Sequence, residues 1–175
     1  MKILIIVGMP AAGKNIARTY AEKRDFPYFA TGDFVREEVG RRGIERTPDN
    51  MARLSTELRG EDGMGVTRLA LASAMKTDAP VVMIEGMRSW PEIELIRKSA
   101  PAVVVAFVAP RALRRERIVS RGRSDDSAAG FAERDGREIS YGTAAPIALA
   151  DEYILNTGTL EEALKAMDTI VRKYR

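Results

Sequence analysis

Residues 8–14 have a composition and spacing suited to holding phosphate groups. The run Gly8-Met9-Pro10-Ala11-Ala12-Gly13-Lys14 fits the pattern G-x-x-x-x-G-K, directly after an apolar run and at the start of a predicted helix. In this layout, backbone N–H groups of the loop and of the helix N-terminus surround a β-phosphate, and Lys14 reaches the β- and γ-phosphates. The alternative is a chance glycine-rich turn, but the order strand, loop, Lys, helix argues against it. We therefore predict that this loop binds ATP.

Two positions of this phosphate loop depart from the usual pattern. Residue 15 is Asn where the pattern has Ser or Thr to hold Mg²⁺, and the amide oxygen of Asn15 is a poorer ligand. Residue 11 is Ala where many such loops carry Gly, which matters only if the backbone φ angle is positive there. The loop therefore predicts nucleotide binding, while efficient turnover depends on how the metal is held.

The composition excludes several kinds of site. The 175 residues contain no Cys and no His, so a Cys/His zinc site, a disulfide framework and a histidine base are all absent. Any general base must be a carboxylate, and any metal must be a hard ion such as Mg²⁺. The net charge of +3 and the 6% aromatic content do not favour nucleic acid binding. The N-terminal apolar run is too short to span a membrane and lacks a cleavage site, so we expect a cytoplasmic protein.

Short apolar runs alternate with longer amphipathic runs, which is typical of βαβ units around a parallel sheet. We predict strands at residues 2–8, 27–30, 80–85, 102–109 and 152–155. We predict helices at residues 13–23, 33–40, 49–58, 65–75, 91–98, 111–120, 131–140 and 160–173. No repeat or linker divides the chain, so we expect one domain over residues 1–175. Residues 121–130 contain no large apolar side chain, and we expect a surface loop, or lid, there.

The segment after the second predicted strand resembles a kinase motif. Thr31-Gly32-Asp33-Phe34-Val35-Arg36 resembles the T-G-D-x-x-R of adenylate kinases, and Gly8-Met9-Pro10 resembles the G-x-P that opens their phosphate loop. The resemblance to nucleoside monophosphate kinases and dephospho-coenzyme A kinases implies that Thr31 and Arg36 bind the acceptor's phosphate. It also implies that Asp33 organises the waters of Mg²⁺. A helix N-terminus followed by an Arg is a reasonable anion site, and plain helix capping by Thr31 and Asp33 is the alternative.

The third predicted strand ends in a carboxylate, Glu85, followed by Gly86 and Arg88. This resembles the D-G-x-x-R region of the same kinases, with Glu in place of Asp and a shorter spacing. A carboxylate at the carboxyl end of a central parallel strand lies where open α/β sheets bind ligands. Glu85 would order Mg²⁺ or accept the acceptor's proton, and Arg88 would hold a phosphate. An ordinary ion pair between Glu85 and Arg88 is the alternative.

Arginines are frequent on both sides of the predicted lid. Those with the most informative spacing are Arg117, Arg121, Arg123 and Arg134. Their placement resembles that of the arginines flanking the lid of adenylate kinases, which implies that they close over the transferring phosphates. Arginine suits this role because its planar guanidinium binds phosphate oxygens bidentately. Arg111 and Arg114 are expected to be solvated surface residues.

Residues 150–161, near the end of the chain, closely resemble the A-D-x-x-I-x-N-x-G-x-L segment of dephospho-coenzyme A kinases. The resemblance implies that Asn156 and Gly158 present a polar edge to the adenine of ATP. An ordinary strand-to-helix turn with Thr159 as the N-cap is the alternative. Most of the chain takes part in the combined resemblance, which looks closest to an archaeal group of adenylate-kinase-related proteins. It implies a P-loop NTPase fold of the α/β class, with three layers (α/β/α), a five-stranded parallel sheet and a small lid.

The sequence thus predicts an ATP-dependent nucleotide kinase with ATP and Mg²⁺ as cofactors and small-molecule nucleotides as partners. The acceptor is a nucleoside monophosphate or a dephospho-coenzyme A-like molecule, and Arg53, Arg59 and Arg68 could all face its pocket. The alternative is an ATP-binding regulatory or switch protein on a kinase scaffold with little phosphotransfer, which Asn15 favours. The oligomeric state is not indicated.

Overall fold

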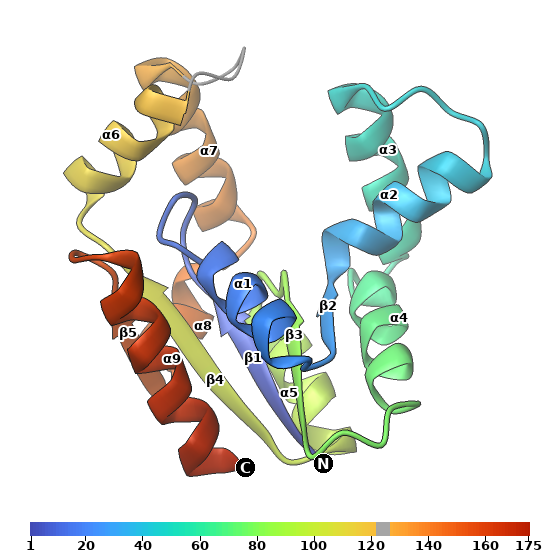
Figure 1. Ribbon diagram of the computed structural model, residues 1–175. Coiled ribbons are helices and arrows are strands. Elements are labelled where there is room, and N and C mark those ends of the chain that lie inside the picture. The colour runs from blue at the N-terminus through green and yellow to red at the C-terminus, as the bar shows by residue number, and fades with distance from the viewer. Residues whose placement is uncertain (122–126) are drawn as a thin grey trace.

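The computed structural model describes residues 1–121 and 127–175. Its centre is a parallel sheet with the strand order β2-β3-β1-β4-β5 (Figure 1). The strands are β1 (Lys2–Val7), β2 (Tyr28–Ala30), β3 (Val81–Glu85), β4 (Ala102–Val108) and β5 (Glu152–Leu155). β1, β3 and β4 are almost continuous runs of aliphatic residues because both faces of the sheet are covered. The prediction of a five-stranded parallel sheet is confirmed.

Helices follow the strands in the alternating order that the sequence predicts. They are α1 (Asn15–Arg24), α2 (Thr31–Arg41), α3 (Pro48–Arg59), α4 (Gly65–Ala74), α5 (Trp90–Ser99), α6 (Arg111–Arg121), α7 (Ala128–Ser140), α8 (Ala144–Ala148) and α9 (Leu160–Tyr174). α8 was not predicted. α7 begins three residues earlier than predicted, where the Ser127 side chain accepts a hydrogen bond from the Gly130 N–H and caps the helix. The last part of the expected loop at 121–130 is therefore helical, and residues 122–126 lie outside the described residues.

The two faces of the sheet are covered by different helices. Side chains alternate along β1, so Leu4 and Ile6 pack toward α1 and α9 while Ile3 and Ile5 pack toward α4 and α5. All four of these side chains are fully buried. The result is the three-layer α/β/α arrangement that the sequence predicts. No helix within residues 1–121 and 127–175 is long and apolar enough to cross a membrane.

Two pairs of helices extend past the carboxyl end of the sheet. Figure 1 shows α6 and α7 on one side of the loop that joins β1 to α1, and α2 and α3 on the other side. The α2–α3 arm has a small core of its own, in which Val39 and Leu54 are buried. The α6–α7 arm buries Ile118 and Phe131. The phosphate loop therefore lies between the α2–α3 arm and the α6–α7 arm, and each arm has buried apolar side chains.

Candidate active site

The loop between β1 and α1 turns sharply, and its glycines lie where a side chain has no room. A Cβ atom on Gly8 would lie 2.6 Å from the carbonyl oxygen of Phe107. A Cβ atom on Gly13 would lie 2.1 Å from the side-chain nitrogen of Asn156, and the φ angle of Gly13 is +112°. Ala11 also has a positive φ angle, 60°. The left-handed conformation costs a non-glycine residue about 1–2 kcal/mol, so Ala11 makes this loop conformation less stable than a glycine would.

Lys14 folds back over the first part of the loop. Its Nζ donates hydrogen bonds to the carbonyl oxygens of Gly8, at 2.7 Å, and Met9, at 3.3 Å. Burial lowers the pKa of Lys14 below its ordinary value, and the carboxylates of Glu85 and Glu138 partly offset this effect. The ammonium group therefore has charged partners around it but little water, which favours exchange of these carbonyl contacts for phosphate oxygens.

The next three carbonyl oxygens of the loop each accept a hydrogen bond from a side chain outside it. The pairs are Arg114 with Pro10 at 3.1 Å, Arg117 with Ala11 at 3.3 Å and Asn156 with Ala12 at 2.9 Å. The expectation that Arg114 is a solvated surface residue was wrong, because Arg114 is only 6% exposed and is paired with Asp135. Arg111 matches the expectation better, since its side chain is 64% exposed.

Asn156 lies beside the phosphate loop and lines the cavity next to it, so the contact with adenine that the resemblance implied stays a prediction. Its side chain is buried and bonded to the phosphate loop, so it shapes the loop from behind. Gly158 lies beside Glu162 at the start of α9, where Thr159 and Glu162 form a reciprocal capping box. The alternative of a strand-to-helix turn capped by Thr159 therefore describes this segment well.

The phosphate loop forms one wall of a cavity with a volume of about 450 Å³. Three of the arginines singled out in the sequence line this cavity, namely Arg117, Arg121 and Arg134. Arg123 lies outside the described residues. The cavity therefore combines loop amides, Lys14 and guanidinium groups from α6 and α7, which is a chemistry suited to a polyphosphate.

Glu85 stands at the end of β3 and lines both this cavity and a second one of about 650 Å³. The hydroxyl group of Tyr28 donates a hydrogen bond to Glu85 Oε2 at 3.1 Å. Burial and the neighbouring Glu85 carboxylate raise the pKa of Tyr28, so the phenol stays protonated as a donor. No sequence pattern pointed to Tyr28 as a site residue, because a tyrosine in a short strand is ordinary.

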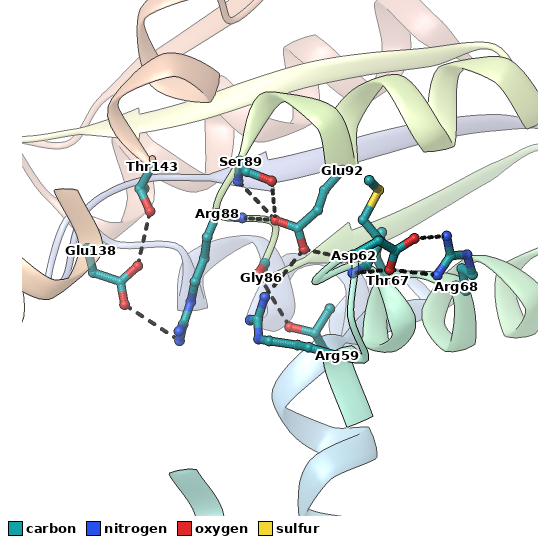
Figure 2. Close-up of polar contacts among 12 residues, drawn as sticks. Arg59, Asp62, Thr67, Arg68, Gly86, Arg88, Ser89, Glu92, Glu138 and Thr143 are labelled. Carbon is teal, nitrogen blue, oxygen red and sulfur yellow. Dashed lines mark hydrogen bonds and ion pairs between the residues drawn. The ribbon is translucent and has the colours of Figure 1, made fainter. Parts of the chain in front are cut away.

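Arg88 does not supply the ion pair with Glu85 that was the alternative. Its Nη2 lies 3.5 Å from Glu138 Oε1, and its guanidinium carbon lies 4.9 Å from the centre of the Tyr141 ring. Figure 2 shows the Arg88 side chain directed to Glu138, whose other carboxylate oxygen accepts a hydrogen bond from Thr143. The loop after β3 is thus connected to α7, although Arg88 also lines the second cavity.

The second cavity holds most of the residues expected to bind the acceptor. Thr31, Asp33, Arg36 and Arg88 line it, together with Arg18 of α1. Asp33 accepts hydrogen bonds from Arg36 and from Arg18, the latter at 2.6 Å. Burial alone would raise the pKa of Asp33, but hydrogen bonds from Arg18 and Arg36 outweigh it and lower the pKa below the ordinary value. The cavity thus combines three guanidinium groups with the carboxylates of Asp33 and Glu85.

Arg18 is a site residue that the sequence reasoning missed. It lies four residues after Lys14, and this spacing places both side chains on the same side of α1. Its guanidinium carbon also lies 4.8 Å from the centre of the Tyr28 ring. A cation one helical turn after the loop lysine was the signal that could have identified it.

Thr31 contacts the loop after β3 instead of capping a helix. α2 begins at Thr31 itself, and the Thr31 hydroxyl donates to the carbonyl oxygen of Gly86 at 3.4 Å. A Cβ atom on Gly86 would lie 2.0 Å from that hydroxyl oxygen, so only glycine fits there. The capping alternative therefore does not describe Thr31. Asp33 does lie in the first turn of α2.

The other arginines considered for the acceptor have partners elsewhere. Arg68 pairs with Asp62, and Arg59 Nη1 lies 3.7 Å from the buried carboxylate of Glu92 (Figure 2). The lining of the 650 Å³ cavity includes neither of them, nor Arg53. The second cavity is therefore lined by residues of α1, α2, the end of β3 and the loop after it.

Asn15, Asp33 and Glu85 all line the second cavity, and each has a side-chain oxygen. Among the described residues, no group of three or more acidic side chains could hold a metal ion by itself. Mg²⁺ is usually held by one or two carboxylates, with phosphate oxygens and water filling the remaining positions. The donor set therefore fits Mg²⁺ that arrives with a nucleotide.

Comparisons with known proteins give the family and the fold. Residues 7–131 match a family model described as an AAA domain. UPF0200 proteins of Thermococcus gammatolerans and Methanocaldococcus jannaschii are 40% and 37% identical, over 98% and 99% of this chain and 94% and 90% of theirs. The crystal structure of TT1252 from Thermus thermophilus has a TM-score of 0.66 at 17% identity, covering 99% of this chain and 97% of that one. Shikimate kinase from Bacteroides thetaiotaomicron has a TM-score of 0.63 at 14% identity, covering 97% of this chain and 98% of that one. Both structures share the fold of this chain.

Proposed function

We propose that this chain, which belongs to the UPF0200 protein family, is an ATP-dependent kinase for a phosphate-bearing, nucleotide-like acceptor. One observation carries the proposal most directly. Glu85 lines both the cavity of the phosphate loop and the cavity that holds Arg18 and Arg36. Two cationic cavities that meet at one carboxylate suit a donor phosphate on one side and an acceptor on the other.

The donor side consists of the phosphate loop and the α6–α7 arm. ATP would place its β-phosphate against the loop amides, with Lys14 exchanging its contacts to Gly8 and Met9 for the β- and γ-phosphates. Arg117, Arg121 and Arg134 line the same cavity and would stabilise the charge that develops on the transferring group. Catalysis would then consist of positioning and electrostatic stabilisation.

The acceptor side consists of α2 and the ends of β2 and β3. Arg36 and Arg88 would bind the acceptor's own phosphate, and Thr31 would fix the loop at Gly86. If the attacking oxygen is a hydroxyl, Glu85 would receive its proton, because Glu85 borders both cavities. The phosphate oxygen of a nucleoside monophosphate is largely ionised at neutral pH and needs no base, and Glu85 would then serve to order Mg²⁺. The acceptor would be a nucleoside monophosphate or a dephospho-coenzyme A-like molecule.

Asn15, Asp33 and Glu85 would hold Mg²⁺ through their oxygens, directly or through water. When bound, the ion supplies positive charge that neutralises the β- and γ-phosphates. Asp33 would have to loosen its ion pairs with Arg18 and Arg36 for this role, and the acceptor's phosphate is a ready partner for both arginines. Binding of the acceptor would thus release the carboxylate.

Asn15 favours a second candidate function, an ATP-binding switch protein with little phosphotransfer. The position lacks the hydroxyl ligand of the usual loop pattern. In that case nucleotide binding would change the contacts of the two arms without a chemical step. The acceptor dependence of ADP release separates the two functions.

A coupled assay of ADP release with ATP and Mg²⁺ tests the proposal across nucleoside monophosphates and dephospho-coenzyme A. We expect one acceptor to raise ADP release well above the rate without acceptor. Lys14→Met should abolish this increase, while Lys23→Met, a change to an exposed lysine at the end of α1, should not. Tight ATP binding with no acceptor-dependent ADP release would contradict the kinase proposal and favour the switch.

A further inference from the structure

Arg114 is a buried cation that the proposed reaction does not use. Its guanidinium group donates to both carboxylate oxygens of Asp135, at 2.7 and 3.0 Å, and both residues are less than 9% exposed. The Phe131 ring lies beside it, with the guanidinium carbon 5.3 Å from the ring centre. Removal of the Asp135 carboxylate would leave the Arg114 guanidinium buried without an anionic partner, so the pair is held firmly in place.

This fixed guanidinium also reaches the phosphate loop. Nη1 of Arg114 donates to the carbonyl oxygen of Pro10 at 3.1 Å, as well as to Asp135. The C=O and N–H groups of one trans peptide unit point in opposite directions. A donor that holds the Pro10 carbonyl therefore turns the N–H group of Ala11 the other way. Ala11 is also the residue with the unfavourable φ angle of 60°, so the peptide before it needs an external constraint.

We propose that Arg114 is a positioning residue for the phosphate loop. Asp135 and Phe131 fix its guanidinium group, which holds the Pro10–Ala11 peptide in the orientation that presents the Ala11 N–H to a phosphate. The same contact joins α6 and α7 to the loop. The inference rests on the proposed function in one respect, since it takes the loop to bind a nucleotide. It assigns Arg114 no contact with the nucleotide.

Arg114→Lys tests the inference, with Arg111→Lys as a matched control. Lysine keeps a cation beside Asp135 but cannot contact the carboxylate bidentately and reach Pro10 at once. Arg111 lies on the same helix, 3.3 Å from the same Asp135 and 5.1 Å from the centre of the same Phe131 ring. Its polar contact is to Asp135 and not to the loop. The two substitutions therefore differ in the bond to Pro10 and also in burial, since Arg114 is 6% exposed and the Arg111 side chain is 64% exposed, so the measurements must separate a local effect on the loop from a general loss of stability.

Two measurements on the full chain decide the matter. Titration calorimetry with ADP should show a Kd about tenfold higher for Arg114→Lys, the size expected for one lost charge-assisted hydrogen bond, and within twofold of wild type for Arg111→Lys. Hydrogen exchange of the nucleotide-free protein should show faster exchange of the amides in residues 8–15 for Arg114→Lys alone. Equal effects of the two substitutions, or no effect of either, would overturn the inference.

A local effect on the loop is distinguished from general destabilisation by comparing the amide exchange rates of residues 8–15 with those of β4 in the Arg114→Lys variant. Selective acceleration of exchange in residues 8–15 supports the inference, whereas equal acceleration in β4 overturns it. The exchange measurement needs neither ADP binding nor turnover. If the wild-type protein has no kinase activity, the proposed function is refuted, but the exchange measurement still tests the role of Arg114.

Discussion

The side-chain amide of Asn156 donates a hydrogen bond to the carbonyl oxygen of Ala12 at 2.9 Å, across 144 positions of sequence. The backbone carbonyl oxygen of Asn156 also accepts a hydrogen bond from Arg117 at 2.9 Å. A Cβ atom on Gly13 would collide with the Asn156 side chain, so the loop and this residue fit closely. The end of β5 therefore supports the phosphate loop from behind.

Asn156→Ala should weaken the binding of polyphosphates in general. The substitution leaves the Ala12 carbonyl without its donor, which costs about 1–3 kcal/mol. Because the effect acts through the loop, the Kd values for ATP and for inorganic tripolyphosphate should rise by similar factors in titration calorimetry. Thr157→Ala, at the exposed neighbouring residue, should change neither. A loss confined to ATP would instead support contact between Asn156 and adenine.

Ala11→Gly should stabilise the protein or leave its stability unchanged. Glycine removes the left-handed strain of about 1–2 kcal/mol but adds about 0.5–1 kcal/mol of unfolded-state entropy, so the net gain lies between about 0 and about 1.5 kcal/mol. Ala12→Gly is the control, because Ala12 is buried and has no positive φ angle. Urea unfolding should show lower stability for Ala12→Gly. A clear loss of stability in Ala11→Gly would contradict the strained geometry.

Asp33 should make stability depend on pH in the acid range. Its folded-state pKa is lowered, so the carboxylate stabilises the fold above its ordinary pKa of 3.8. This stabilisation is lost as the pH falls through the lowered value. The difference in unfolding free energy between wild type and Asp33→Asn should therefore be largest near neutral pH and shrink below pH 3.8. Urea unfolding over a pH series measures it, and a difference that does not vary with pH would refute the ion pairs with Arg18 and Arg36.

Arg88→Met should raise the KM for the acceptor and leave the KM for ATP almost unchanged. A hydrogen bond to a charged group is worth about 1.5–3 kcal/mol, so the KM for the acceptor should rise about tenfold or more, with little change for ATP. Arg68→Met is the matched control, since Arg68 pairs with Asp62 away from the cavity. Steady-state kinetics with each substrate varied in turn separates the two effects. Equal changes in both KM values would indicate that Arg88 only holds α7 through Glu138.

The layers of this fold follow from short-range signals in the sequence. β1, β3 and β4 are almost continuous apolar runs because both faces of the sheet are covered, and the strands are recognisable without their neighbours. α8 escaped prediction because five residues that include Pro146 carry no helical period. The phosphate loop and the Thr31–Arg36 segment were recognisable for a similar reason. Each motif is one continuous stretch of sequence, and the spacing of its residue types can be read without knowing the fold.

The contacts that sequence reasoning did not predict join residues from distant segments. Arg114 is buried only because Asp135, on another helix, neutralises its charge. Asn156 meets the phosphate loop because β5 lies beside β4 in the sheet. Tyr28 reaches Glu85 because β2 pairs with β3. None of these pairs shares a local pattern, so only the folded arrangement reveals them.

Asn15 decides how well the metal is held, and Asn15→Thr should raise turnover. Threonine supplies the hydroxyl ligand of the usual loop pattern. The substitution should cost little stability, because Asn15 is exposed and is not the N-cap residue of α1, which is Lys14. We expect kcat to rise up to about tenfold, equivalent to about 1.4 kcal/mol of activation free energy, and half-saturation at a lower Mg²⁺ concentration.

Asn15→Ala is the control for this prediction, because it removes the amide oxygen and adds no ligand. The coupled assay, run over a Mg²⁺ titration at saturating ATP and acceptor, compares the three proteins. If the amide oxygen contributes to the metal site, Asn15→Ala should need more Mg²⁺ than wild type, and Asn15→Thr should need less. Identical Mg²⁺ dependence in all three would contradict a role for residue 15 and leave the ion to Asp33 and Glu85, which line the same cavity.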